Sequence, residues 1–321
     1  MRILKIACGV LMMTLFAHAT FAQTYPARPI RIVVPFPPGG ITDTAARVLA
    51  QHLTTNLSQQ VIVDNRPGGN SIIGTDLVAK AAADGYTVFY GDLATTAIVT
   101  ALYPKLPYDL FQDFAPVSMV GVSPLLLVVH PSLPVTSVKD LVALAKARKG
   151  QINYASAGTG STFHLAAELL RHEAGIDIVH VPFKGSGPAM PALLSGEVAM
   201  IFSTTPQVLP HIRAGRLRAV AVTAPSRVSF LPGIPAVAET YRGFEMFSVG
   251  GVLAPAGLPP GVVERLNKEI ASVVNRQDVR QRFESLGTQS KTTTPEELGA
   301  YLKAETAKFA KLIRISGTRV D

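Results

Sequence analysis

Two short glycine-rich loops contain the residue types best suited to holding a ligand. The first, Pro35-Phe-Pro-Pro-Gly-Gly-Ile-Thr-Asp43, joins an apolar strand-like run to a helical apolar pattern over 43–53. The second, Ser156-Ala-Gly-Thr-Gly-Ser-Thr162, also stands between a predicted strand and a predicted helix. Glycine lets the backbone approach a ligand, and the free amides of a helix N-terminus favour an anion. A tight turn is the alternative for either loop alone, but the pair predicts an anion site.

Other polar residues beside these loops extend the candidate site. We expect Thr42 or Asp43 to cap the first helix, and Asp43 could also face the ligand. His164 follows the second loop and would either brace it or donate to the ligand. Lys184 follows a predicted strand and either pairs with a ligand carboxylate or lies on the surface.

Several kinds of chemistry lack their required residues. The second loop is not a dinucleotide fingerprint, because Phe163 stands where the third glycine should be, and no P-loop ending follows. Ser161 is not in a Gly-x-Ser-x-Gly elbow, and His164 on the same helix is poorly placed to activate it. His172-Glu173 lacks the second histidine of a zinc motif. We expect no catalytic residue, metal or cofactor, and a carboxylate as the anion.

The N-terminal residues 1–22 have the pattern of a secretory signal peptide. Arg2 and Lys5 precede an apolar run over 6–17, which is too short to cross a bilayer. We expect cleavage after Ala22, with cleavage after Ala19 as the alternative. The sequence therefore predicts export to the periplasm.

The composition is that of a globular protein. The 321 residues are 48% apolar and 16% charged, and the chain without its predicted signal suits two compact domains. The only cysteine, Cys8, would leave with the signal, so no disulfide is expected. The net charge of +8 comes from scattered basic residues without aromatic interleaving. We therefore expect no nucleic-acid partner. We also expect a monomer.

Strands alternate with helices along the chain, which predicts parallel sheets with right-handed crossovers. Four consecutive strand–helix units in the middle third predict a doubly wound lobe. Two strand-like segments, 117–130 and 247–253, are expected to cross between lobes, and 109–116 to be a loop. The helices after Pro259 are expected to pack on the first lobe's sheet. The expected division is 23–123 with 248–321 as lobe 1, and 124–247 as lobe 2.

The motifs along the chain resemble those of one family, the Bug receptors, which are periplasmic solute-binding receptors of tripartite tricarboxylate transporters. The resemblance covers essentially the whole predicted mature chain. The segments that carry it are Tyr25-Pro-Ala-Arg-Pro-Ile-Arg-Ile-Val-Val-Pro-Phe-Pro-Pro-Gly-Gly-Ile-Thr-Asp43, Val63-Asp-Asn-Arg-Pro-Gly-Gly69, Ala81-Ala-Ala-Asp-Gly-Tyr86, Leu106-Pro-Tyr-Asp109, Asp113-Phe-Ala-Pro-Val117, Tyr154-Ala-Ser-Ala-Gly-Thr-Gly-Ser161 with His164, Val181-Pro-Phe-Lys-Gly185 and Leu217-Arg-Ala-Val-Ala-Val-Thr223.

The resemblance implies an α/β fold of the periplasmic binding protein type II kind, with two doubly wound lobes joined by two crossover strands. Such lobes close like a Venus flytrap on a small organic acid, here a dicarboxylate, a tricarboxylate or a related carboxylate. Membrane permease subunits are the implied partners. A ligand-sensing receptor for a signalling kinase is one alternative, and a periplasmic hydrolase is another.

The resemblance also implies that both glycine loops hold the proximal carboxylate, while the segments after the third strand and after 197–202 line the rest of the site. The chain departs from the family pattern at Gly91-Asp-Leu-Ala-Thr-Thr-Ala97 and at Ser203, where family members often have an Asp. A carboxylate without an amino group is therefore favoured, unless Asp92 points inward. The expected ligand-binding residues are Phe36, Pro38, Gly39, Gly40, Asp43, Asp92, Ala94, Thr95, Ala157, Gly158, Thr159, Gly160, Ser161, His164, Lys184, Ser203 and Thr204.

Overall fold

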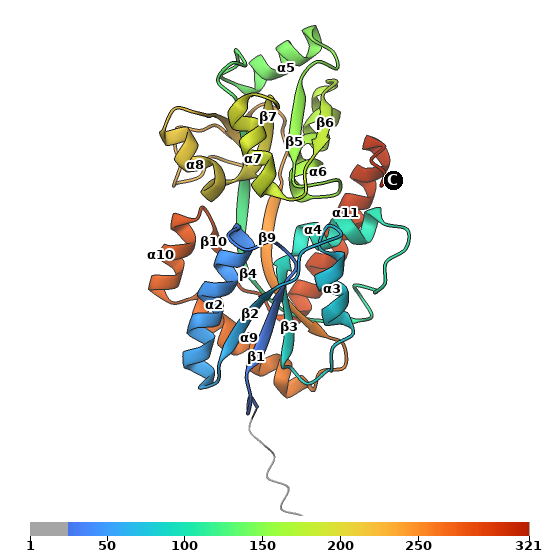
Figure 1. The fold of residues 1–321 in the computed structure, drawn as a ribbon, viewed down its shortest axis with the longest axis vertical. Coiled ribbons are helices and arrows are strands. Elements are labelled where there is room, and N and C mark those ends of the chain that lie inside the picture. The colour runs from blue at the N-terminus through green and yellow to red at the C-terminus, as the bar shows by residue number, and fades with distance from the viewer. Residues whose placement is uncertain (1–24, 321) are drawn as a thin grey trace, which may run out of the picture.

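The computed structural model describes residues 25–320, which form two lobes joined by long strands (Figure 1). The predicted signal peptide over 1–22 lies outside the described residues. Among the described helices, none is both long enough and apolar enough to cross a membrane.

The first lobe is built on a sheet that starts with parallel strands. β1 (Ile30–Val34) lies between β2 (Val61–Asn65) and β3 (Thr87–Asp92) and is parallel to both. β9 (Phe247–Pro255) pairs antiparallel with β3 and with β4 (Phe114–Val129). The short β10 (Gln289–Ser290) also pairs with β4. The helices of this lobe are α2 (Ile41–Leu57), α3 (Ile72–Ala79), α4 (Leu93–Leu102), α9 (Pro260–Val274) and α10 (Gln277–Ser285).

Strand β4 joins the lobes because its two parts pair with different strands. Residues 114–124 pair with β9, whereas 125–129 lie between β7 (Met200–Thr204) and β8 (Arg218–Val222). The sheet of the second lobe continues through β5 and β6, which run parallel. The remaining elements of this lobe are β5 (Asn153–Ser156), β6 (Val179–Pro182), α5 (Val138–Ala147), α6 (Thr162–Ala174), α7 (Ser186–Ser195), α8 (Thr205–Arg213) and η1 (Val237–Glu239).

This architecture confirms the predicted fold class of two doubly wound lobes with strands crossing between them. The expectation of a loop over 109–116 is wrong at its C-terminal end, because β4 already begins at Phe114. The ladder tolerates Pro116, which has no N–H to donate, because the register shifts between Pro116 and Ser118.

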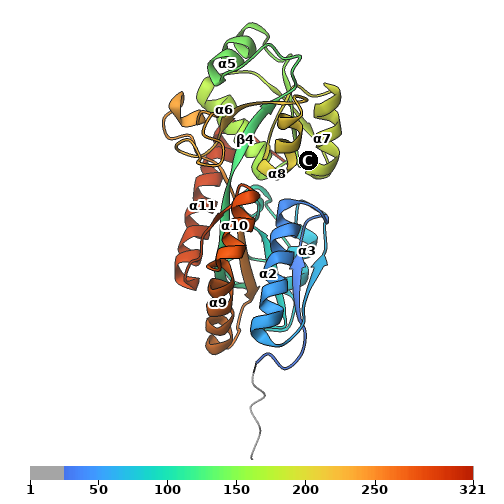
Figure 2. The same cartoon turned by 90° about the vertical axis from the view of Figure 1, so that its left-hand side faces the viewer.

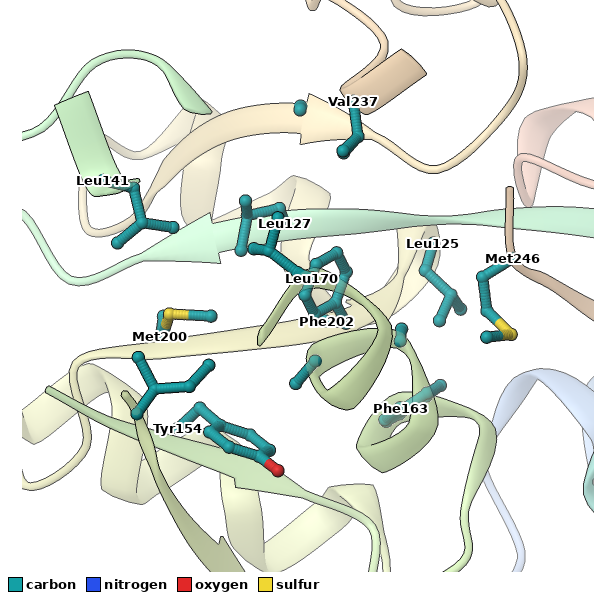
Figure 3. Close-up of a cluster of buried hydrophobic side chains, with 14 of the residues drawn as sticks. Leu125, Leu127, Leu141, Tyr154, Phe163, Leu170, Met200, Phe202, Val237 and Met246 are labelled. Carbon is teal, nitrogen blue, oxygen red and sulfur yellow. The ribbon is translucent and has the colours of Figure 1, made fainter. Parts of the chain in front are cut away.

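Apolar side chains fill both lobes. In the first lobe, Leu49 and Leu53 of α2 pack in a cluster with residues of β1 and α9. In the second, Leu127, Tyr154 and Phe202 lie in a cluster that also contains residues of α5 and α6 (Figure 3). The second cluster also contains Ala94, Ala97 and Ile98 of α4 in the first lobe, so burial stabilises each lobe and the contact between them.

The last helix, α11 (Pro295–Ser316), packs against both lobes. Leu302 lies in a first-lobe cluster, whereas Phe309 lies in the second-lobe cluster, and Arg171 of α6 donates to the Ser316 carbonyl. Figure 2 shows α11 running along the molecule beside both lobes. The C-terminal helices were expected to pack on the first lobe's sheet. The first half of α11 lies in a first-lobe cluster, and its far end also contacts α6 of the second lobe. The division at 123/124 and 247/248 stays a prediction.

We expect Phe309→Ala to lower the free energy of unfolding by about 3–5 kcal/mol, because it leaves a cavity in a packed core. Phe309 is fully buried, so the lost contacts cannot be replaced by water. The control is Phe111→Ala, since Phe111 is 43% exposed and should cost little. Urea denaturation measures both. Equal losses in the two variants would mean that α11 does not stabilise the second lobe.

Candidate functional site

The first glycine loop brings the N-terminus of α2 to the junction between the lobes. α2 begins at Ile41, so Gly40 takes the N-cap position, and no side chain caps the helix. The expectation that Thr42 or Asp43 is the cap is wrong, because the helix starts before both of them. The first hydrogen bond of the helix is donated by Thr44, so the amides of residues 40–43 remain available to a ligand.

The Asp43 carboxylate stabilises this loop by accepting hydrogen bonds. Asp43 is buried, and its carboxylate accepts hydrogen bonds from the Gly39 amide at 2.9 Å and from Asn65 at 3.0 Å. It also forms an ion pair with Arg47 at 2.9 Å. Although burial raises the pKa of Asp43, the hydrogen bonds from Arg47, Gly39 and Asn65 lower it below its usual value. The side chain therefore fixes the loop and leaves the anion to the backbone amides.

The second glycine loop is held largely by its own side chains. The Ser161 hydroxyl caps α6 by accepting from the His164 amide at 3.2 Å, and it donates to the Gly158 carbonyl at 2.8 Å. The amides of Gly158 and Gly160 donate to Ser156 and to His164 Nδ1. Within residues 25–320, the amides of Ala157 and Thr159 make no hydrogen bond. These two amides are the backbone donors of this loop that remain available to a ligand.

Each glycine loop lies close to a residue of the opposite lobe. Asn70, in the glycine turn before α3, donates to the Thr159 carbonyl of the second loop at 3.0 Å. A Cβ on Gly185 in the second lobe would lie 4.0 Å from the Pro37 ring of the first loop. Each loop therefore lies at the junction between the lobes, and that both contact one ligand stays a prediction.

Asp92 lies buried where the lobes meet, and its carboxylate is fully occupied. One oxygen accepts the amides of Val249 at 2.8 Å and Ala94 at 3.3 Å. The other accepts the hydroxyls of Thr95 at 2.9 Å and Thr162 at 2.8 Å. Burial raises the pKa of Asp92 above its usual value. Because four donors already surround it, Asp92 offers no free carboxylate to an amino group.

His164 and His180 stack behind the second loop with ring centroids 4.0 Å apart. The Ser156 hydroxyl contacts His180 Nε2 at 2.6 Å. Burial lowers the pKa of His164 to about 3 and that of His180 to about 4. The hydrogen bond from Gly160 needs an unprotonated Nδ1, so neutral His164 braces the loop. Bracing is one of the two roles predicted for this residue.

Ser203 and Thr204 end strand β7, and both are buried. Their hydroxyls donate to the Gln207 side-chain oxygen at 2.9 and 3.3 Å. Gln207 in turn donates to Ser186 at the start of α7. These residues tie together two helix starts of the second lobe.

The remaining predicted residues are spread around the first loop and beyond it. Phe36 is half buried against the first-lobe core, Pro38 is exposed, and Ala94 is buried inside α4. Lys184 is exposed and makes no ion pair with any other described residue. Among the described residues, no group of three potential ligands could hold a metal ion. Ligand contact by the seventeen predicted residues stays a prediction.

A hollow beside the first loop is lined by residues that sequence reasoning missed. It lies between α2 and α10, over β4 and β9, which we call the hinge strands. Asp92 is the only predicted site residue in its lining. Ser123 and Ser248 are directly paired on β4 and β9, and Ser123 shares a 2.7 Å hydrogen bond with Thr288. The sequence signal that could have predicted this hollow is the presence of serines in hinge strands that are otherwise apolar. The polar lining consists of Thr42, Tyr90, Asp92, Ser123, Ser248 and Thr288.

We expect the stability of the protein to fall as the pH drops from about 6.5 towards about 3, partly because of His164. Its pKa is lowered in the folded state, so the unfolded chain binds more protons in this window, and acid favours unfolding. The slope from one histidine is at most about 1.4 kcal/mol per pH unit.

The matched variant is His164→Asn, whose side-chain oxygen can accept from Gly160 but does not titrate. Chemical denaturation across this pH range should give a shallower slope for the variant than for the wild type. Identical slopes would show that His164 is not buried in its neutral form.

The chain is similar to known proteins over most of its length. The family model described as "Tripartite tricarboxylate transporter family receptor" matches residues 45–317. Protein BugT of Bordetella pertussis is 41% identical over 301 residues, covering 93% of this chain and 92% of BugT.

Two solved structures have the same fold over almost their full lengths. Rpa4515 of R. palustris with adipate has a TM-score of 0.87 and 35% identity, covering 92% of this chain and 99% of that one. MatC of Rhodopseudomonas palustris with bound malate has a TM-score of 0.82 and 30% identity, covering 90% of this chain and 100% of that one. The chain therefore belongs to the family of tripartite tricarboxylate transporter receptors.

Proposed function

We propose that this protein is a periplasmic solute-binding receptor that captures a small carboxylate between its lobes and delivers it to the permease subunits of a tripartite tricarboxylate-type transporter. The observation that carries the proposal is the uncapped N-terminus of α2, which presents the amides of residues 40–43 beside the junction with the second lobe. Backbone N–H groups and the helix dipole together favour an anion at this place.

Capture follows from the placement of the donors on two lobes. A carboxylate bound to α2 alone would use only the amides of the first lobe. When the lobes are close, the free amides of Ala157 and Thr159 add contacts that exist only in that arrangement. Ligand binding therefore shifts the equilibrium between open and closed forms towards closure. A permease can then recognise the closed lobes.

The relatives' ligands support a small organic acid. Rpa4515 was solved with adipate and MatC with malate, and both molecules carry two carboxylates. The family is periplasmic, which supports our proposal that residues 1–22 are a signal peptide for export. We also propose that the exported protein is a monomer.

We also propose that the protein catalyses no reaction. A hydrolase would need a free serine hydroxyl beside a base. Ser161 instead uses its hydroxyl to cap α6 and to bind Gly158, while His164 Nδ1 accepts from Gly160. Ser156 does lie beside His180 Nε2, but it is fully buried and its oxygen accepts the Gly158 amide. Ligand sensing for a signalling kinase would use the same cleft with another partner, and the assignment to a family of transporter receptors favours uptake.

The test combines mass spectrometry of any ligand carried through purification with calorimetry of the full mature chain against a panel of carboxylates. Small-angle scattering should show a smaller radius of gyration when a bound carboxylate is present. If no carboxylate binds and the radius of gyration is unchanged, the proposal is wrong.

We expect Gly40→Val to weaken carboxylate binding at least about tenfold while the protein still folds, because the side chain would crowd the helix N-terminus. Gly40 has a negative φ that valine tolerates, and an added Cβ would lie 4.0 Å from the nearest atom, the Pro37 carbonyl oxygen. The control is Gly261→Val at the start of α9, where nothing lies within 4 Å. Calorimetry that finds the same affinity in both variants would remove the first loop from the site.

A further inference from the structure

Two hydroxyl groups that face the hollow beside the first loop, those of Tyr90 and Ser248, have no hydrogen-bond partner among residues 25–320. Tyr90 is 2% exposed and Ser248 is 8% exposed, and both line the hollow. A Cβ on Gly250 would lie 2.7 Å from the Tyr90 hydroxyl, so the glycine leaves space for that group. Both hydroxyl oxygens are accessible from the hollow, so each can hydrogen-bond to water or to a ligand group that displaces the water. A molecule in the hollow would satisfy both.

The pair of Ser123 and Thr288 adds further capacity for hydrogen bonds in the same place. Their mutual bond of 2.7 Å uses one donor, and the other hydroxyl proton remains free. Ser123 is paired with Ser248 across the antiparallel hinge strands, so their side chains lie on the same face of the sheet. The hollow therefore presents a compact group of hydroxyls rather than scattered polar atoms.

The charge of the lining points to the kind of group that fits. The lining contains no lysine, arginine or histidine, and its one acidic residue is Asp92. A second carboxylate would enter this space without a cation to balance it and would approach the carboxyl of Asp92. An uncharged hydroxyl or carbonyl group would hydrogen-bond to Tyr90 and Ser248 without that cost.

We propose that this hollow binds the second functional group of the ligand and selects an uncharged hydroxyl or carbonyl group over a second carboxylate. This inference rests on the proposed function, in which the amides of residues 40–43 hold the ligand's carboxylate. The hollow adjoins those amides because Ile41 and Thr42 form part of its lining. Tyr90 and Ser248 are then the residues that determine specificity.

Calorimetry with the full mature chain tests the selectivity. The ligands are malonate, succinate, glutarate and adipate, each compared with the ω-hydroxy acid and the unsubstituted acid of the same chain length. We expect the best hydroxy acid to bind at least about tenfold more tightly than the dicarboxylate of its length. Tyr90→Phe and Ser248→Ala should each weaken its binding about fivefold and leave the unsubstituted acid unchanged.

The control is Tyr108→Phe, which removes the hydroxyl of another buried tyrosine of the first lobe that does not line the hollow. It should leave every affinity unchanged. Dicarboxylates that bind as tightly as the hydroxy acids, or affinities that neither Tyr90→Phe nor Ser248→Ala changes, would overturn the selectivity while the proposed function stands. If none of the acids binds, the proposed function and this inference both fail.

Discussion

Four hydrogen bonds to the buried carboxylate of Asp92 tie together the parts of the molecule that must be aligned for a ligand to be held. They come from hinge strand β9, from the first turn and Thr95 of α4, and from Thr162 at the start of α6 in the second lobe. A buried carboxyl with fewer donors would be costly. The geometry of the cleft therefore depends on donors from both lobes meeting at one residue.

Both glycine loops follow one physical plan. A side chain from the helix that follows each loop reaches back to bind a loop amide: Asp43 binds Gly39, and His164 binds Gly160. These bonds fix the loops without the ligand, so less conformational entropy is lost on binding. The amides left over, at residues 40–43 and at Ala157 and Thr159, are the ones that can receive a carboxylate.

The sequence predicted the fold and the two loops well, because strand, glycine loop and helix follow one another in local patterns. It was less informative about side chains. Ligand contact by Asp43 and Asp92 stays a prediction. The local pattern could not show that donors of the protein itself already bind both carboxylates, among them the Val249 amide that the β3–β9 pairing brings to Asp92. The hydroxyls of Ser123 and Ser248 were missed because only the pairing of two distant strands brings them together. The contact of α11 with the second lobe was missed for the same reason, because tertiary packing and not a local sequence pattern places that helix.

Hydrogen exchange of backbone amides tests the central claim, that both loops grip one carboxylate. Exchange should be followed in peptides covering 36–43 and 157–162, with and without a saturating carboxylate identified by calorimetry. The account predicts that both segments become protected together on binding. Protection of one loop alone, or of neither, would contradict it.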